Sequence, residues 1–325
     1  MKENIFPSIN PVIINKIQTA ENILIIAHKN PDGDALSSTL ALSLMMEKLG
    51  KNAYAINEGP FLRAELSDLA DKVSQDIPEE LIEKNPLVIV ADCSTPDRPG
   101  IVFEKIKHLD RIVIDHHSSG DEFAESNSSY IVPYSPSTTL LVDVLRESLG
   151  LELDKQLAEY FYTGLATDTG FFHFISNRIG AEVFKRAASY TEAGVDPYTM
   201  YDKLTDGKDI DEIFNSAEIL KKTKQYFDGH LLIAIQPKEM EMSRLSDDIY
   251  SQLLKVKGVK AVVFLKEKSD RTEIGFRAKN GSDLDVGELA HSLGGGGHRL
   301  AAGASLNCTS KEAERKIVNL FTDII

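Results

Sequence analysis

Four short segments that are apolar throughout constrain the fold of this chain more than any other feature. They are NILIIAH (22–28), NAYAI (52–56), PLVIVAD (86–92) and RIVID (111–115). Strands that do not alternate between apolar and polar residues are typical of parallel sheets that helices cover on both faces. The pattern therefore predicts an α/β fold with a parallel sheet in the amino-terminal part of the chain.

Helical periodicity fills the chain between and after these strands. Helices are expected at 34–50, 138–150, 155–170 and 178–194. The first of them has an acidic start, and Gly50 is a typical stop signal. These helices are the elements that would cover the two faces of the sheet.

The composition changes near residue 196, and a second α/β pattern follows. Residues 196–225 are rich in polar and charged side chains, as domain boundaries often are. Beyond them, strands are expected at 230–235, 260–267 and 271–279, and helices at 245–258, at 285–294 and from about residue 310. The sequence thus predicts a domain over 1–195, a linker over 196–225 and a smaller α/β domain over 226–325.

Charge and cysteine content limit the partners and the compartment. Lys and Arg number 36 against 50 Asp and Glu, a formal net charge of −14, so the chain lacks the broad basic face that binds long nucleic acids. Cys93 and Cys308 are too few for a disulfide framework. The amino terminus lacks the apolar core of a signal peptide, and no apolar run approaches the ~20 residues of a membrane span. We expect a cytoplasmic protein with no membrane partner.

Acidic and histidine side chains follow three of the four strands at the point where each strand ends. The first strand ends at His28 and is followed by Asp32 and Asp34, the third ends at Asp92, and the fourth ends at Asp115, His116 and His117. Ligands of open parallel sheets bind at the carboxyl ends of the strands. These side chains, which are distant in sequence, are therefore expected at one edge of the sheet.

The residue types at this edge suit a divalent metal ion. Two imidazoles and three carboxylates, without a cysteine cluster, favour Mn²⁺, Mg²⁺ or Zn²⁺; they are His28, Asp32, Asp34, Asp92 and His116. Asp32 and Asp34 are separated by one residue, so each could serve a different ion while Asp92 bridges the two. The helix that opens at Ala35 would point its amino-terminal amides at the same place. Asp168, in GLATDTGFF, is a fourth candidate carboxylate because a buried carboxylate needs a partner.

Each of these motifs has a simpler explanation when it is taken alone. PDGD is a common turn sequence, a single Asp after a strand is often a helix N-cap, and a histidine pair often packs in a core. A metal site is favoured because the same coincidence would be needed at four positions of the chain.

A run of glycines in the last third of the chain is the second candidate site. In LGGGGHRLAAGA (293–304), Gly295, Gly296 and Gly297 precede His298. Glycines allow a close approach of the backbone, whose amides together with one imidazole could bind a phosphate or carboxylate. A flexible loop is the alternative for the glycines alone, and the AAGA stretch could begin a helix or pack closely. Arg277 could clamp a phosphate or be a solvated cation on a strand face.

Five motifs in order give the chain a family resemblance. They are HKNPDGDALSS, VADCS, IDHHSS, GLATDTGFF and GGGGHRLAAGA. The chain resembles the DHH phosphoesterase superfamily with the DHH-associated C-terminal domain, and in particular its short bacterial members that act as nanoRNase and pAp phosphatase. The resemblance implies a phosphoesterase with two Mn²⁺ ions, which Mg²⁺ or Co²⁺ could replace, an active site in the cleft between two domains, and often a homodimer.

The resemblance also implies a role for each matching residue. One ion would be held by His28, Asp32 and Asp92, and the other by Asp34, Asp92, His116 and Asp168. Asp115 would support the histidines, and His117 would lie by the scissile phosphate. The far end of the substrate would be held by Arg277, Gly295, Gly296, Gly297 and His298.

The expected reaction is the attack on phosphorus by a hydroxide held between two metal ions, with a nucleoside hydroxyl leaving. The expected substrates are oligonucleotides of two to five nucleotides, pAp, or both. Two alternatives stay open: a phosphodiesterase acting on cyclic di-AMP or pApA, and a nucleotide-binding regulator without catalysis. A pyrophosphatase is disfavoured because its second domain should lack GGGGH.

Overall fold

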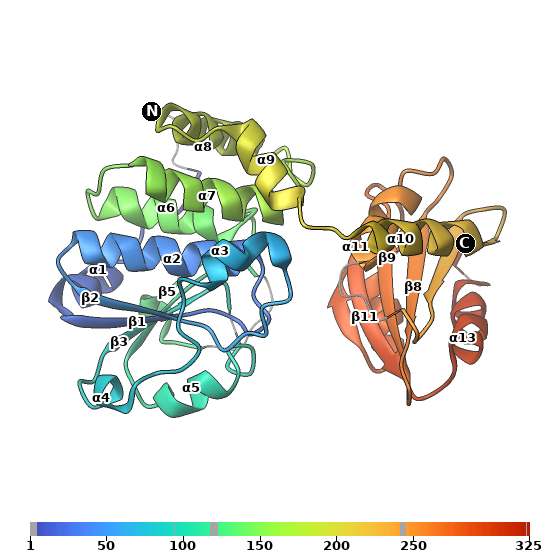
Figure 1. The fold of residues 1–325 in the computed structure, drawn as a ribbon, viewed down its shortest axis with the longest axis horizontal. Helices are drawn as coiled ribbons and strands as arrows, with labels where there is room; N and C mark the ends of the chain where they lie inside the picture. The colour runs from blue at the N-terminus through green and yellow to red at the C-terminus, as the bar shows by residue number, and fades with distance from the viewer. Residues whose placement is uncertain (1–4, 94, 118–122, 241–244, 323) are drawn as a thin grey trace. The chain divides into compact units, whose positions relative to one another are not determined.

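The computed structural model describes residues 5–93, 95–117, 123–240, 245–322 and 324–325. It divides the chain into two compact units, Met1–Gly207 and Lys208–Ile325 (Figure 1). The segment expected as a linker, 196–225, contributes helix α9 (Pro197–Thr205) to the first unit and helix α10 (Ile210–Lys222) to the second. In the part of the chain that the structure describes, no helix has both the length and the apolarity needed to cross a bilayer.

The first unit is built on a parallel sheet of five strands in the order β2-β1-β3-β4-β5. All neighbouring strands are paired in parallel, which confirms the predicted fold class. The strands are β1 (Asn22–Ile26), β2 (Asn52–Ile56), β3 (Leu87–Ala91), β4 (Arg111–Asp115) and β5 (Ser129–Ile131). Only β5, a short edge strand, had no counterpart among the expected strands.

Helices cover both faces of this sheet, as its continuous apolar strands require (Figure 1). One face packs against α1 (Pro11–Thr19), α2 (Gly33–Lys48), α6 (Thr138–Ser148) and α7 (Lys155–Asp168), with α8 (Gly180–Glu192) outside them. The other face packs against α4 (Glu79–Ile82) and α5 (Ile101–Ile106). Short turns of helix lie at η1 (Ala64–Leu66), α3 (Ser67–Ala70) and η2 (Ser126–Ser128).

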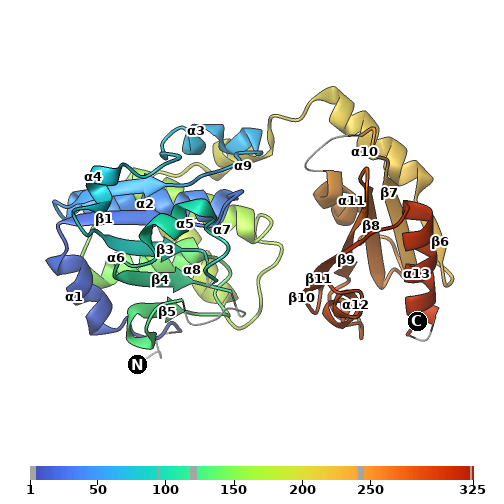
Figure 2. The ribbon, with the colours of Figure 1, turned by 90° about the horizontal axis from the view of Figure 1, so that it is seen from below.

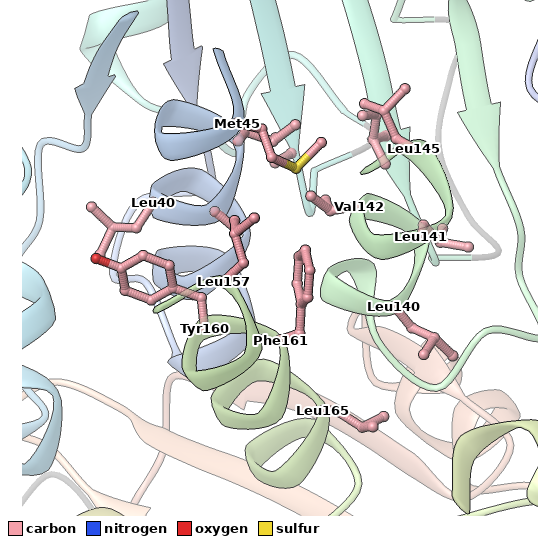
Figure 3. Packing of buried hydrophobic residues seen from close by; sticks show 14 of the residues in the cluster. Leu40, Met45, Leu140, Leu141, Val142, Leu145, Leu157, Tyr160, Phe161 and Leu165 are labelled. Carbon is pink, nitrogen blue, oxygen red and sulfur yellow. The ribbon is translucent and has the colours of Figure 1, made fainter. Parts of the chain in front are cut away.

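The pleat of each strand divides its side chains between these two layers. In β1, Ile23 and Ile25 enter the core beneath α2, whereas Leu24 and Ile26 enter the core beneath α5. Figure 3 shows part of the first core, where buried side chains of α2, α6 and α7 pack against one another. Helix α2 is therefore buried on nearly all sides, which fixes the position of its amino terminus.

The second unit contains a mixed sheet of six strands in the order β10-β11-β9-β8-β7-β6, in which only β7 and β8 are parallel. The strands are β6 (Lys224–Tyr226), β7 (Leu231–Gln236), β8 (Ala261–Glu267), β9 (Thr272–Ala278), β10 (Gly296–His298) and β11 (Ala301–Leu306). Helices α10 and α11 (Leu245–Leu253) cover one face, and α12 (Val286–Ser292) and α13 (Ser310–Thr322) cover the other. Helix α12 lies beside β10 and β11 (Figure 2).

The glycine run forms a strand of a hairpin, not a flexible loop. Gly296 pairs with Gly303, and Gly297 pairs with Ala302, in an antiparallel ladder. The AAGA stretch is strand β11, so a helix start there is wrong and the close-packing alternative is correct. Glycine is needed at position 297, because a Cβ there would lie 2.5 Å from the Cα of Ala302.

Candidate active site

The structure brings together all six side chains that were expected to bind metal. They lie at the carboxyl edge of the first sheet, as the strand-end argument required. Two groups have ligand atoms within 4.8 Å of one another: His28, Asp32 and Asp92 in one, and Asp34, His116 and Asp168 in the other. A third such group joins Asp92 to Asp115, His116 and His117.

Asp92 lies at the centre of this cluster and is 2% exposed. Its Oδ2 is 3.4 Å from Nε2 of His28, and its Oδ1 is 3.5 Å from Nε2 of His116. The hydroxyl of Thr138 donates a hydrogen bond of 3.0 Å to Oδ1. The residue directly follows β3 and has a φ of 55°, in the left-handed region. Strained backbone of this kind clusters at functional sites, and here it turns the carboxylate between the two histidines.

Two of the histidines are held so that Nε2 faces carboxylates. Nδ1 of His28 donates to the carbonyl of Lys29 at 2.9 Å, and Nδ1 of His116 donates to the carbonyl of Ser135 at 3.2 Å. Because a carbonyl only accepts, these bonds place the proton of the neutral ring on Nδ1 and leave a lone pair on Nε2. A lone pair that faces carboxylates needs a proton or a cation between them, so the arrangement fits a metal centre.

The two carboxylates of PDGD serve different parts of the site. Asp32 is the N-cap of α2: its Oδ1 accepts hydrogen bonds from the amides of Asp34 and Ala35, at 3.1 and 3.0 Å. Its Oδ2 lies 3.9 Å from Nε2 of His28. The N-cap explanation and the proposed ligand role are therefore compatible, because each uses a different oxygen.

Asp34 is buried against the amino terminus of α6. Its carboxylate accepts hydrogen bonds from the amides of Thr138 and Thr139, at 2.6 and 3.0 Å, and from the hydroxyl of Thr139 at 2.8 Å. These donors and the helix dipole favour a negative charge at this position. They also fix the direction of the carboxylate toward His116 and Asp168.

Two glycines allow the helices that carry these carboxylates to approach closely. A Cβ on Gly33 of α2 would lie 2.3 Å from Oγ1 of Thr167, and a Cβ on Gly164 of α7 would lie 2.6 Å from Oδ1 of Asp34. At each glycine, the backbone of one helix thus lies against a side chain of the other, which brings Asp34 close to Asp168.

The concentration of negative charge perturbs the protonation of the cluster. Burial, reinforced by the charge of Asp92, raises the pKa of Asp34 to about 7. Burial, reinforced by the charge of Asp34, raises the pKa of Asp168 to about 8. Burial opposes the charged form of His116, but the carboxylates of Asp92 and Asp168 outweigh it and raise its pKa to about 9. A divalent cation would replace these protons and stabilise the charged carboxylates.

The first aspartate of the DHH motif orients the residues that follow it. Asp115 is fully buried, and its Oδ1 accepts hydrogen bonds from the amides of His116 and His117 and, at 2.7 Å, from Nδ1 of His117. Burial opposes its ionisation, yet the bond and charge of His117 hold the pKa of Asp115 below its usual value. Nε2 of His117 accepts a hydrogen bond of 3.3 Å from Nη1 of Arg98.

Arg98 was not identified from the sequence. It lies in the loop after β3, six positions after Asp92. The sequence VADCSTPDRPG shows a cation in the loop after a strand that carries a candidate ligand. The spacing of residues along the chain, however, does not predict that this cation contacts His117.

The candidate binding residues of the second unit lie around a separate pocket of about 540 Å³. Arg277, Gly296 and Gly297 line it, together with Tyr250. The guanidinium carbon of Arg277 lies 4.7 Å from the ring centroid of Tyr250, a cation–π contact that fixes the arginine. Gly295 precedes the hairpin and is not among the lining residues. The side chain of His298 lies outside the described part of the structure.

Comparison with known proteins gives a consistent family. The DHH family, N-terminal domain, matches residues 22–165, and the DHHA1 domain matches residues 231–325. The bifunctional oligoribonuclease and PAP phosphatase NrnA of Thermus thermophilus is 30% identical over 87% of this chain and 84% of its own length. The cyclic-di-AMP phosphodiesterase GdpP of Geobacillus thermodenitrificans is 29% identical over 94% of this chain, which spans only 48% of that protein.

A solved structure supports the same fold. The exopolyphosphatase-related protein from Bacteroides fragilis superposes with a TM-score of 0.86 at 23% identity, over 97% of this chain and 96% of that one. Together with the two domain matches and the NrnA relationship, this shows that the chain belongs to the DHH family of phosphoesterases and carries a DHHA1 domain.

Proposed function

We propose that the protein is a divalent-metal-dependent phosphoesterase that hydrolyses oligonucleotides of two to five nucleotides to nucleoside monophosphates, and pAp to AMP and phosphate. The observation that carries this proposal is the pair of ligand groups that meet at Asp92, with His117 beside them. Similarity to NrnA over most of both chains supports the choice of substrates.

The donor set suits Mn²⁺, which we propose as the bound ion. One group would hold an ion through His28, Asp32 and Asp92, and the other through Asp34, His116 and Asp168 with Asp92 shared. Carboxylate oxygens with imidazoles suit Mn²⁺ or Mg²⁺, and Co²⁺ has similar preferences. Ions bound there would neutralise charge on a phosphate and lower the pKa of a water molecule.

The remaining site residues would bind and orient the phosphate. Asp115 fixes the ring of His117, which would lie beside a scissile phosphate. In the second unit, a pocket of about 540 Å³ has the size of a nucleotide site. Arg277 and the glycine hairpin would hold a second phosphate or the far nucleoside there. A net charge of −14 agrees with short substrates rather than long polymers.

The decisive experiment is turnover of a substrate panel by the Mn²⁺-loaded protein, with and without chelator. The panel contains pAp, pApA, cyclic di-AMP, an RNA of five nucleotides and pyrophosphate. Chelator-sensitive release of mononucleotides from the RNA or pApA, or of phosphate from pAp, would support the proposal. No turnover, combined with retained nucleotide binding, would replace it with a regulatory role.

Cyclic di-AMP hydrolysis is the second candidate, because GdpP matches nearly the whole of this chain. Since this chain spans about half of GdpP, that similarity concerns a part of a larger protein. Cyclic di-AMP as the best substrate of the panel would establish this alternative and refute the first.

A further inference from the structure

Arg98 occupies a fixed place between the loops that carry the candidate ligands. Its carbonyl accepts a hydrogen bond of 2.8 Å from the amide of Lys29, and its own amide donates to the carbonyl of Thr95 at 3.3 Å. Lys29 directly follows His28 and accepts the bond from that ring. The loop after β3 is thus attached to the loop after β1, and the Arg98 side chain is held near the edge of the sheet.

The contact with His117 determines which nitrogen of the ring carries the proton. A guanidinium group only donates, so Nε2 of His117 must accept at the 3.3 Å distance to Arg98. Nδ1 then donates to Asp115 at 2.7 Å. A series of hydrogen bonds therefore runs from the buried Asp115 through His117 to the half-buried Arg98.

Among the described residues, His117 is the hydrogen-bond partner of the Arg98 side chain, and most of its donors have no partner there. A guanidinium has five N–H donors in a planar fork, and the contact with His117 accounts for one nitrogen. Among the residues that the structure describes, no carboxylate lies within 4.0 Å of the Arg98 guanidinium. An arginine with free donors beside a cluster of carboxylates and imidazoles is suited to a planar anion such as a phosphate.

We infer that Arg98 binds the phosphate of the substrate directly, beside His117, and that its bond to His117 holds the guanidinium in place for this contact. This inference rests on the proposed function, because it names a further substrate-binding residue of that site. Arg98 would donate to non-bridging oxygens, whose negative charge it neutralises as the phosphoryl group is transferred.

The alternative is that Arg98 only braces the ring of His117. A double-mutant cycle separates the two roles, because a residue that acts only through His117 has no effect once His117 is removed. The variants are Arg98→Gln, His117→Ala and the double variant. Arg111→Gln is the matched control: it removes an arginine from the start of β4, at the opposite edge of the sheet, where the guanidinium stacks on Phe103.

Two quantities are measured on the Mn²⁺-loaded proteins. The first is the affinity for AMP and for inorganic phosphate, by calorimetry. The second is kcat/KM on the substrate that the wild type hydrolyses best. Arg98→Gln is expected to lower kcat/KM by about 100-fold, the usual effect of losing one transition-state donor. It is also expected to weaken AMP binding by about 10-fold in both the wild-type and the His117→Ala backgrounds. The affinity for Mn²⁺ and the behaviour of Arg111→Gln should stay close to wild type.

Partial recovery of AMP affinity by methylguanidinium in the variant that combines Arg98→Ala with His117→Ala would support direct binding, since no ring is left there for the guanidinium to brace. Unchanged AMP affinity in Arg98→Gln, or a loss that disappears in the His117→Ala background, would overturn the inference. A wild type that hydrolyses nothing on the panel would refute the proposed function instead. The AMP and phosphate affinities would still decide the role of Arg98.

Discussion

Replacing Gly164 by alanine tests whether the close approach of α7 to the side chains of Asp34 and Thr139 sets the geometry of the ligand cluster. A Cβ at this position would lie 2.3 Å from Cγ2 of Thr139, 2.5 Å from its Oγ1 and 2.6 Å from Oδ1 of Asp34. Thr139 is fully buried and bonded to Asp34, so neither group can move aside freely.

The expected magnitude follows from three opposing contributions to the free energy of unfolding. Alanine in a helix interior is favoured over glycine by about 1 kcal/mol. Overpacking a filled site costs about 1–3 kcal/mol. Weakening the hydrogen bond from Thr139 to the charged Asp34 costs about 1.5–3 kcal/mol when the bond is lost. The net destabilisation is about 1.5–5 kcal/mol, which lowers Tm by roughly 3–20 °C for a unit of this size.

The assay is thermal unfolding of the variant with chelator and across a Mn²⁺ titration. A displaced Asp34 should also weaken Mn²⁺ binding, so the metal-induced rise in Tm should need more Mn²⁺ than in the wild type. Gly180→Ala is the matched control, because a Cβ there meets only Cγ2 of Ile175 at 3.6 Å, an ordinary contact. If Gly164→Ala is as stable as Gly180→Ala and binds Mn²⁺ equally well, the close-packing argument is wrong.

Three further predictions address the charge, the pH dependence and the second pocket. Asp92→Asn should unfold near the wild-type Tm in chelator but lose the stabilisation by Mn²⁺, because an amide, unlike a carboxylate, cannot supply an oxygen ligand to each of two ions. An unchanged Mn²⁺ affinity, measured by calorimetry, would contradict a bridging role of Asp92. In metal-free protein, the pKa values of Asp34 (about 7), Asp168 (about 8) and His116 (about 9) are all raised. The folded state then binds more protons than the unfolded chain, so Tm should fall as the pH rises from about 6 to 9. A flat or rising Tm in this window would refute the argument that these three groups hold protons in the metal-free site. A slope of Tm against pH that Asp168→Asn leaves unchanged would refute it as well. Tyr250→Leu should raise KM about 3- to 10-fold with little change in kcat, since the cation–π contact worth roughly 0.5–2 kcal/mol is lost. Tyr250→Phe keeps the aromatic ring and should keep KM. Equal KM values for the two variants would show that the ring does not hold Arg277.

The strand-end residues could be predicted because a simple rule connects sequence to space. In a parallel sheet, the carboxyl ends of neighbouring strands lie at one edge, so His28, Asp92 and His116 had to converge once their strands were recognised. Asp168 is different, since it lies at the end of a helix. Its placement depends on the packing of α7 against α2 through Gly164, which a local pattern does not contain.

The features that were missed depend on contacts between distant loops. Arg98 reaches His117 because its loop is bonded to Lys29, a tertiary contact without a sequence signal. The AAGA stretch was ambiguous for another reason. Short segments of small residues have weak intrinsic preference for a helix or a strand, and the pairing with β9 decides in favour of β11.

The left-handed backbone of Asp92, with its φ of 55°, has an evolutionary consequence. Glycine adopts this conformation freely, and asparagine and aspartate do so more readily than other side chains. Codons for aspartate and asparagine differ by one base. A single nucleotide change can therefore remove the central negative charge while the local chain path is preserved. A sequence of this fold with asparagine at the position of Asp92 could therefore keep the chain path and lack the carboxylate that joins the two ligand groups.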